Sequence, residues 1–331
     1  MSDSSMRAII IRDHGGPEQL QLWEWEKPMP GPEELLVRIH ATALNRADSL
    51  QRQGKYPPPT DASPILGLEM AGEVVGAGSE VTGWKLGDKV CGLLAGGGYA
   101  EYCVIDQSLA MPMPLGWSYA QAAAVPEAFL TAFQGLFWLG GLKTGQKVLI
   151  HAGASGVGTA AIQLAKAMDA ELYITASAAK HEFCHALGAH HCYDYKEEDF
   201  SELIDDQTHH KGVDVILDFV GAPYFQRNLS CIARDGKLVM LGFMGGAMLD
   251  NVNLGPILRK RISILGSTLR NRDLAYKAQL TQAMQAYVWP RFQANMIKPV
   301  IDQVFSWKEV VEAHQYLESN QSKGKIVLEI D

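Results

Sequence analysis

Between residues 147 and 267, short apolar runs alternate regularly with segments of helical periodicity. Several of these runs, such as KVLIHA (147–152) and VDVILDFV (213–220), are almost continuously apolar. A strand with this pattern is buried on both faces, as happens when helices cover both sides of a parallel sheet. The alternation therefore predicts βαβ units and a doubly wound parallel sheet, which places the chain in the α/β class.

The expected elements extend over the whole chain. The predicted strands of the parallel sheet are 147–152, 171–176, 191–195, 213–220, 237–243 and 261–267, and the predicted helices are 118–138, 156–168, 179–187 and 222–232. The first 110 residues are rich in short β-branched runs separated by Gly, Pro and Asp, and after residue 270 come helices 274–287 and 308–320 and a last strand, KIVLEI. We therefore expect a β-rich domain of residues 1–122 and 271–331, interrupted by a cofactor domain of residues 123–270.

Composition excludes several classes of protein. The 331 residues are 47% hydrophobic and 20% charged, and the net charge of -8 leaves no basic footprint for nucleic acid or an anionic membrane. The five cysteines are scattered without a CxxC pair, which indicates a reducing compartment, and the N-terminus has no basic segment typical of a signal peptide. The apolar stretch 120–142 contains Pro126, Glu127 and Gln134, so we interpret it as a buried helix. We expect a cytoplasmic protein.

A glycine turn stands between the first strand and the first following helix of the α/β segment, in KVLIHAGASGVGTAAIQLAK. Its glycines are Gly153, Gly156 and Gly158, whereas the usual GxGxxG spacing would place a glycine where this chain has Ser155. A strand that enters a helix through such a turn directs backbone N–H groups and the helix dipole at a pyrophosphate. The context predicts a dinucleotide site, and the alternative is a tight turn without a ligand.

The next strand indicates which dinucleotide is bound. NAD sites carry an acidic residue at the end of the second strand to bind the ribose 2′-hydroxyl. Here that strand ends ITASAAK, which offers Thr175, Ser177 and Lys180 and no acid. Hydroxyls beside a cation suit a 2′-phosphate, so we expect NADPH as the cofactor. The alternative is that Ser177 caps a helix and Lys180 is solvated.

Residues 181–191 read HEFCHALGAHH and fit the zinc-protease pattern HExxHxxGxxH. In that pattern the ligands and the general base would be His181, His185, His191 and Glu182. Within the predicted fold, however, the string is a helix and the turn after it, with Phe183 and Leu187 facing the sheet and the first two histidines on the opposite, solvent-facing surface. We therefore expect no metal site, and a zinc metalloprotease is only a remote alternative.

Seven stretches resemble the zinc-free quinone oxidoreductases of the medium-chain dehydrogenase/reductase superfamily. They are ALNRADSLQRQGKYPPP, ILGLEMAGEVVGAGSEVTGWKLGDKV, AAAVPEAFLTAFQ, HAGASGVGTAAIQLAK, YKEEDF, LGSTLRNRD and SNQSKGKIVLE. The resemblance implies a GroES-like catalytic domain, a Rossmann domain for NADPH and a homodimer. Zinc-containing relatives have a cysteine near position 45 and a histidine in a GHE triplet, where this chain has Asn45 and Gly67-Leu68-Glu69. The resemblance thus implies no zinc.

The resemblance also implies where the cofactor and the acceptor bind. The implied catalytic residues are Asn45, Tyr56 and Asp48. The implied cofactor-binding residues are Asn45, Tyr56, Thr131, Ser155, Gly156, Val157, Ser177, Lys180, Tyr195, Phe243, Met244, Gly245, Ser267, Thr268, Leu269 and Lys323. Asn45 and Asp48 have an alternative interpretation as caps of a short helix, and Tyr56 as a cover for apolar surface.

These inferences predict an NADPH-dependent reductase of small, ortho-type quinones that needs no metal. The Tyr56 hydroxyl or the Asn45 amide would steady the charge that develops on the quinone oxygen, and Asp48 would orient its neighbours. One alternative is a zinc-free reductase of activated carbon–carbon double bonds in alkenals or enones. Another is an NADPH-binding protein without catalytic activity, like lens zeta-crystallin. No nucleic-acid or membrane partner is expected.

Overall fold

The computed structural model describes residues 4–331, which form two compact units. Among the described residues, the first unit comprises residues 4–130 and Leu269–Asp331, and the second comprises Thr131–Thr268. The divisions expected from the sequence lie at 122/123 and 270/271. The first crossing lies inside helix α3 (Pro126–Phe133), where periodicity gives no sign of a boundary because one helix runs through it.

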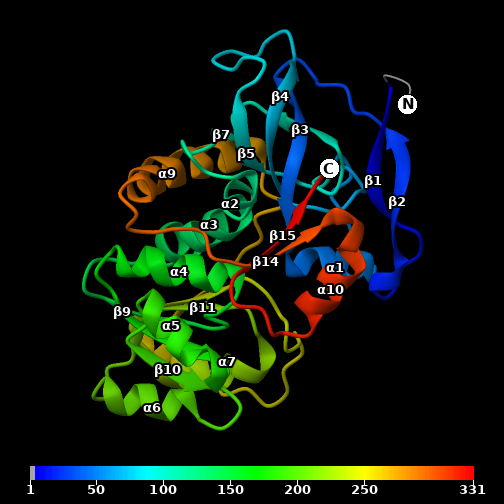
Figure 1. Ribbon diagram of the computed structural model, residues 1–331. Helices are drawn as coiled ribbons and strands as arrows, with labels where there is room; N and C mark the ends of the chain where they lie inside the picture. Colours follow the sequence, from blue (N-terminus) through cyan, green and yellow to red (C-terminus); the bar gives the residue numbers. More distant parts are fainter. Residues whose placement is uncertain (1–3) are drawn as a thin grey trace. The chain divides into compact units, whose positions relative to one another are not determined.

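The second unit contains a six-stranded sheet in which every neighbouring pair is parallel (Figure 1). Its strands are β8 (Lys147–Ile150), β9 (Glu171–Ala176), β10 (His191–Asp194), β11 (Val213–Asp218), β12 (Ile232–Met240) and β13 (Ser263–Gly266). Their spatial order is β10-β9-β8-β11-β12-β13, which is the order 3-2-1-4-5-6 of the Rossmann fold. The predicted doubly wound parallel sheet is confirmed.

Helices cover both faces of this sheet. Helix α4 packs against α5, and α6 packs against α7 (Figure 1). The helices of the unit are η2 (Gln134–Leu139), α4 (Gly156–Lys166), η3 (Ala178–Lys180), α5 (His181–Leu187), α6 (Phe200–Gln207), α7 (Ala222–Cys231) and α8 (Gly255–Lys260). Helices α6 and α8 were not predicted, because both are short and their apolar residues are few.

Three predicted elements differ clearly from the structure, and one of them is helix 274–287, which continues to Gln293 as α9. The segment 118–138 is not one helix but α2 (Tyr119–Ala123), α3 and the π-helical η2 (Gln134–Leu139). Pro126 starts α3, since a proline has no N–H for the ladder and fits the first helical turn. Strand β12 begins five positions before the predicted residue 237, directly after α7.

Tyr119–Leu139 is long and apolar enough to cross a membrane, but 72% of its most apolar stretch is buried inside the structure, as expected for a core helix.

The first unit is built on a seven-stranded mixed sheet and a separate hairpin of β1 and β2. Its strands are β1 (Ser5–Ile11), β2 (Leu20–Glu26), β3 (Glu34–Ala43), β4 (Glu69–Ala77), β5 (Lys89–Leu93), β6 (Tyr102–Asp106), β7 (Ala110–Pro112), β14 (Ile301–Ser306) and β15 (Lys325–Glu329). Its remaining helices are η1 (Pro17–Gln19), α1 (Arg46–Arg52), α9 (Leu274–Gln293), η4 (Trp307–Glu309) and α10 (Val310–Glu318). The C-terminal strand β15 pairs antiparallel with β3, so the end of the chain returns to the first unit as predicted (Figure 1).

Candidate functional site

The glycine turn of the second unit joins β8 to α4 through two crowded glycines. A Cβ atom on Gly153 would lie 2.0 Å from Cγ2 of Ile174, and one on Gly158 would lie 2.4 Å from the Ala152 carbonyl oxygen. Ser155 has an ordinary φ of -73° and caps α4, because its hydroxyl accepts a hydrogen bond of 3.0 Å from the Gly158 N–H. Serine therefore replaces the usual glycine at no cost to the turn.

Three residues proposed for the 2′-phosphate follow neighbouring strands. Ser177 comes directly after β9, Lys180 lies three residues further on, and Tyr195 comes directly after β10. Because β9 and β10 pair in parallel, Ser177 and Tyr195 start from the same edge of the sheet. Thr175 is not available there: it is buried, with its hydroxyl 2.9 Å from Nδ1 of His151.

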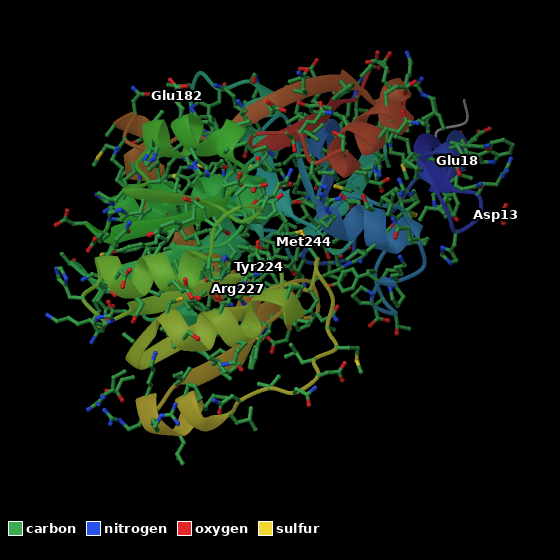
Figure 2. The ribbon with its side chains drawn as sticks, turned by 90° about the horizontal axis from the view of Figure 1, so that it is seen from below. Asp13, Glu18, Glu182, Tyr224, Arg227 and Met244 are labelled. Atoms are coloured by element: carbon green, nitrogen blue, oxygen red, sulfur yellow. The ribbon has the colours of Figure 1, made fainter. Side chains whose placement is uncertain are left out.

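The other predicted cofactor residues of this unit follow the same sheet edge, except Thr131, which is half-buried in α3. Gly156 and Val157 form the first turn of α4. Phe243, Met244 and Gly245 follow β12, and the exposed Met244 is labelled in Figure 2. Ser267 and Thr268 follow β13. Ligands of open parallel sheets bind outside the carboxyl ends of the strands. A dinucleotide fits at this end of the sheet, because the tight glycines and the first-turn N–H groups of α4 lie there.

The HEFCHALGAHH string forms α5, a stop at Gly188 with φ of 124°, and the start of β10. Its histidines contact three separate partners: His181 Nε2 lies 3.1 Å from Ala176 O, His185 Nδ1 lies 2.8 Å from Ala189 O, and His191 Nε2 lies 3.3 Å from Glu171 Oε1. Glu182 is exposed (Figure 2). Within residues 4–331, no cluster of three or more His, Cys, Asp or Glu side chains is arranged to hold a metal ion.

The predicted faces of α5 need correction. Its buried residue is Cys184, whereas Phe183 and Leu187 are only half-buried. His185 is exposed as expected, but His181 is half-buried because its ring turns back onto the Ala176 carbonyl oxygen. The helix is therefore rotated by about one residue from the predicted stripe.

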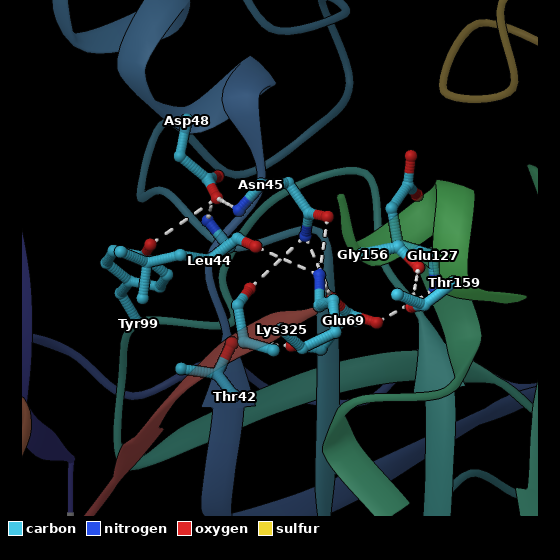
Figure 3. A network of polar contacts seen from close by, with 12 residues as sticks. Thr42, Leu44, Asn45, Asp48, Glu69, Tyr99, Glu127, Gly156, Thr159 and Lys325 are labelled. Carbon is cyan, nitrogen blue, oxygen red and sulfur yellow. Dashed lines mark hydrogen bonds and ion pairs between the residues drawn. The ribbon is translucent and has the colours of Figure 1, made fainter. Parts of the chain in front are cut away.

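In the first unit, Asn45 belongs to a buried ionic network (Figure 3). The Lys325 ammonium donates to Glu69 Oε1 at 2.6 Å, to Asn45 Oδ1 at 2.7 Å and to the Leu44 carbonyl oxygen at 2.9 Å. The side chains of Lys325 and Glu69 are only 4% and 0% exposed. The Asn45 amide nitrogen donates to Glu69 Oε1 at 2.9 Å and to Ala43 O at 3.2 Å. Asn45 would therefore have to exchange an existing bond in order to donate to an acceptor.

Lys325 and Glu69 are not among the site residues predicted from the sequence. A signal was present, because Lys325 opens the apolar strand KIVLE, and a lysine that is buried needs a partner. Lys323, which was selected, is half-buried in the turn before β15, and Leu269 is buried.

Asp48 is fully buried at the start of α1. Its Oδ2 accepts from the Asn45 N–H at 2.7 Å, and its Oδ1 accepts from the Gly67 N–H at 3.1 Å. Burial raises the pKa of Asp48 to about 6, and the two backbone hydrogen bonds partly oppose that rise. Asp48 thus ties together the turns that carry Asn45 and Glu69, in agreement with its expected orienting role and with the helix-cap alternative.

A buried chain of side chains leads to Asp48 from α10. Nη1 of Arg52 lies 3.2 Å from Nδ1 of His314. Nε2 of His314 lies 3.2 Å from the Tyr99 hydroxyl, and that hydroxyl lies 3.4 Å from Asp48 Oδ2. Since arginine only donates, Nδ1 must accept, so Nε2 carries the proton and Tyr99 donates to Asp48. Burial and the nearby Arg52 lower the pKa of His314 to about 3, which keeps it neutral. Because the Tyr99 hydroxyl donates to Asp48, this series of hydrogen bonds favours the ionised form of the Asp48 carboxyl.

Tyr56 lies in the proline-rich loop after α1 and contacts Arg270. The Arg270 guanidinium carbon is 5.4 Å from the centre of the Tyr56 ring, and its Nη2 donates to Gln51 Oε1 at 2.8 Å. Burial raises the pKa of Tyr56, so the hydroxyl keeps its proton. A cavity of about 560 Å³ adjoins this loop. It is lined by Ile10, Ile11, Arg12, Asp13, His14, Trp25, Gln51, Gly54, Pro57, Pro58, Pro64 and Ile65.

Family models identify the class of protein that this fold and these sites define. The alcohol dehydrogenase GroES-like domain matches residues 31–115, and the zinc-binding dehydrogenase domain matches residues 156–288. These two domains make up the medium-chain dehydrogenases and reductases, which are oxidoreductases with a nicotinamide cofactor.

Individual relatives narrow this class. The chain is 35% identical to a quinone oxidoreductase of Pseudomonas aeruginosa, over 97% of this chain and 99% of that protein. It is 32% identical to the synaptic vesicle membrane protein VAT-1 homolog of Danio rerio, over 97% of this chain and 69% of that protein. The chain belongs to the zinc-free quinone oxidoreductase family of the medium-chain dehydrogenase/reductase superfamily.

Longer proteins and solved structures add detail. The chain is 40% identical to a phenolphthiocerol synthesis polyketide synthase of Mycobacterium bovis. The matched region covers 63% of this chain but only 10% of that protein. A mycobacterial protein complexed with NADPH superposes with a TM-score of 0.88 at 28% identity, covering 98% of this chain and 99% of the other. The CurK enoyl reductase superposes with a TM-score of 0.86 at 28% identity, covering 99% and 100%.

Proposed function

We propose that this protein is an NADPH-dependent reductase that transfers hydride to a small quinone without a metal ion. The observation that carries the proposal is the Tyr56 hydroxyl, which keeps its proton and makes no hydrogen bond to another residue within 4–331. Tyr56 lies in a proline-rich loop whose residues Pro57 and Pro58 line a cavity of about 560 Å³, a volume that suits a small molecule. The similarity to quinone oxidoreductases over nearly the whole chain supports the same reaction.

The protein's own groups orient the reactants. When bound, NADPH supplies the hydride, and the chain has to hold the acceptor and exclude water. Tyr56 donates a hydrogen bond to the acceptor oxygen, which gains negative charge. Asp48 and Lys325 keep the Asn45 turn in place. Ser177, Lys180 and Tyr195 hold the 2′-phosphate, which makes NADPH the preferred cofactor. Asn45 and Leu68 stand where zinc-containing relatives have their cysteine and histidine ligands, so the proposal includes no metal.

A second candidate is a reductase of activated carbon–carbon double bonds, favoured by the likeness to CurK enoyl reductase. Hydride transfer to a quinone and to an enone both place charge on a carbonyl oxygen, so one pocket suits both. We expect kcat/KM with an ortho-naphthoquinone to exceed that with an unsaturated aldehyde or a crotonyl thioester by about tenfold or more. Steady-state oxidation of NADPH, with and without a chelator, measures this. A preference for the unsaturated acceptor would support the second candidate, and no quinone turnover would reject the first.

We also propose that two copies of the chain form a dimer through β13. Among residues 4–331 this strand pairs only with β12, so it is an edge of the parallel sheet and has unpaired backbone groups. Ile264 on β13 is 37% exposed and Leu258 on the preceding α8 is 84% exposed, which leaves apolar surface beside that edge. Sedimentation velocity should give a dimer for the wild type and a monomer for Ile264→Lys. A monomeric wild type would contradict this assembly.

A further inference from the structure

Arg270 holds a buried donor that nothing in the described chain accepts. Arg270 is 6% exposed. It belongs to the first unit and is the second residue of the segment Leu269–Asp331. Nε donates to the Ala95 carbonyl oxygen at 2.7 Å, and Nη2 donates to Gln51 Oε1 at 2.8 Å. Nη1, with two hydrogens, has no hydrogen-bond partner among residues 4–331.

Such an orphaned group needs an explanation, because a buried polar atom without a partner is costly and rare in native structures. A guanidinium remains charged, so the natural occupant is an oxygen that is or becomes negative. The two bonds to Ala95 and Gln51 fix the plane of the fork and leave Nη1 preorganised for that oxygen. Preorganised donors of this kind stabilise a developing oxyanion without having to reorganise during the reaction.

We infer that Arg270 is a catalytic residue whose Nη1 binds the acceptor's carbonyl oxygen and stabilises the negative charge that hydride transfer places on it. Tyr56, stacked 5.4 Å from the guanidinium carbon, provides the second donor of this oxyanion site. The ligand class is a conjugated carbonyl compound such as a quinone or an enone, and the tightest ligands should be phenolates, which resemble the anionic product.

The charges around the pair are mixed. Tyr56 and Glu127 each interact electrostatically with Arg270, and so does the carboxylate of Asp48. Glu127 also opposes ionisation of Tyr56, whereas Arg270 favours it. In this cluster of Arg270, Tyr56, Glu127 and Asp48, Arg270 is the positively charged residue and has an unused donor. Tyr56 is the neutral residue of the cluster.

The inference rests on the proposed reductase function for its reaction step, which is balanced. The acceptor receives two electrons and one proton as hydride, while the reduced nicotinamide becomes oxidised. The acceptor's oxygen becomes anionic beside Arg270 and then takes one proton from water, which completes the hydroquinone.

The first experiment does not require turnover. Binding of 4-nitrophenol, whose ionised form is yellow, is titrated against pH in the wild type and in Arg270→Met. We expect the wild type to lower the pKa of the bound phenol by about one unit or more, because a cation stabilises the phenolate, and Arg270→Met to abolish that shift. A bound phenol no more ionised than free phenol, or no binding by the wild type, would overturn the inference.

The second experiment uses the reductase assay. Arg270→Met should lower kcat about 100- to 1,000-fold while leaving the NADPH dissociation constant unchanged, and Arg270→Lys should recover only part of the rate because it lacks the fork. The matched control is Arg272→Met, two residues along the chain from Arg270. It removes a guanidinium whose carbon lies 4.5 Å from the centre of the Tyr276 ring. Equal losses in both variants would overturn the role. A wild type that reduces no acceptor would reject the proposed function, and the phenol titration would still decide on the anion site.

Discussion

Lys325→Met should destabilise the first unit by about 3–5 kcal/mol, measured by urea unfolding at neutral pH. The substitution leaves Glu69 buried without its cation, and a buried charge that has lost its partner is strongly unfavourable. Two further groups lose a donor at the same time, since Lys325 also binds the Leu44 carbonyl oxygen and Asn45 Oδ1. The cost is large because the ammonium makes all three of its hydrogen bonds inside the protein.

Two controls separate this effect from a simple loss of charge. Lys308→Met breaks the exposed ion pair with Asp331 in the same unit and should cost far less, because solvent screens an exposed pair. Adding Glu69→Gln to Lys325→Met should restore much of the stability, because the uncompensated charge is gone. A single variant no less stable than Lys308→Met would show that the buried pair contributes little.

Lys180→Ala should weaken NADPH binding about 10- to 100-fold and leave NADH binding nearly unchanged. A charge-assisted hydrogen bond to the 2′-phosphate accounts for a loss of this size, and NADH has no such phosphate. Fluorescence titration with both cofactors gives the two dissociation constants directly.

Lys211→Ala is the matched control for this change. Lys211 is an exposed lysine of the same unit, but it precedes β11 and so lies toward the amino end of the strand, away from the proposed cofactor edge. Its removal should affect neither cofactor. Equal weakening of NADPH and NADH by Lys180→Ala would refute the assignment of the 2′-phosphate to this residue.

The fold was largely predictable because its main signals are local. Near-continuous apolar runs such as VDVILDFV predicted strands of a parallel sheet, and the glycine turn predicted the first βα connection. Elements were missed or misplaced where local signals are weak. Helix α6 has few apolar residues. Strand β12 begins at Ile232, before the polar residues 233–236, because Ile232 pairs with Val213 of β11.

The candidate site was predictable only in part. The glycine turn, Ser177 and Lys180 could be located because they follow predicted strands, and their roles toward NADPH stay predictions. Lys325, Glu69 and Arg270 were not selected, because their partners lie far away in the sequence. Lys325 is 256 positions from Glu69, and Arg270 is 219 positions from Gln51. The resemblance to the family directed attention to Asn45 and Tyr56 but gave no indication that the Asn45 amide is already fully engaged.

By itself, the sequence determined the α/β class, the doubly wound sheet, the glycine turn and the return of the C-terminal strand, since periodicity and turn chemistry act over a few residues. It also produced a misleading protease motif, because HEFCHALGAHH has the right spacing in one dimension. Only the tertiary structure decided that these histidines contact three separate partners and that Lys325, Asn45 and Glu69 share one buried network. Burial and hydrogen-bond saturation depend on which distant strands and helices pack together, and that information is not contained in any short stretch of sequence.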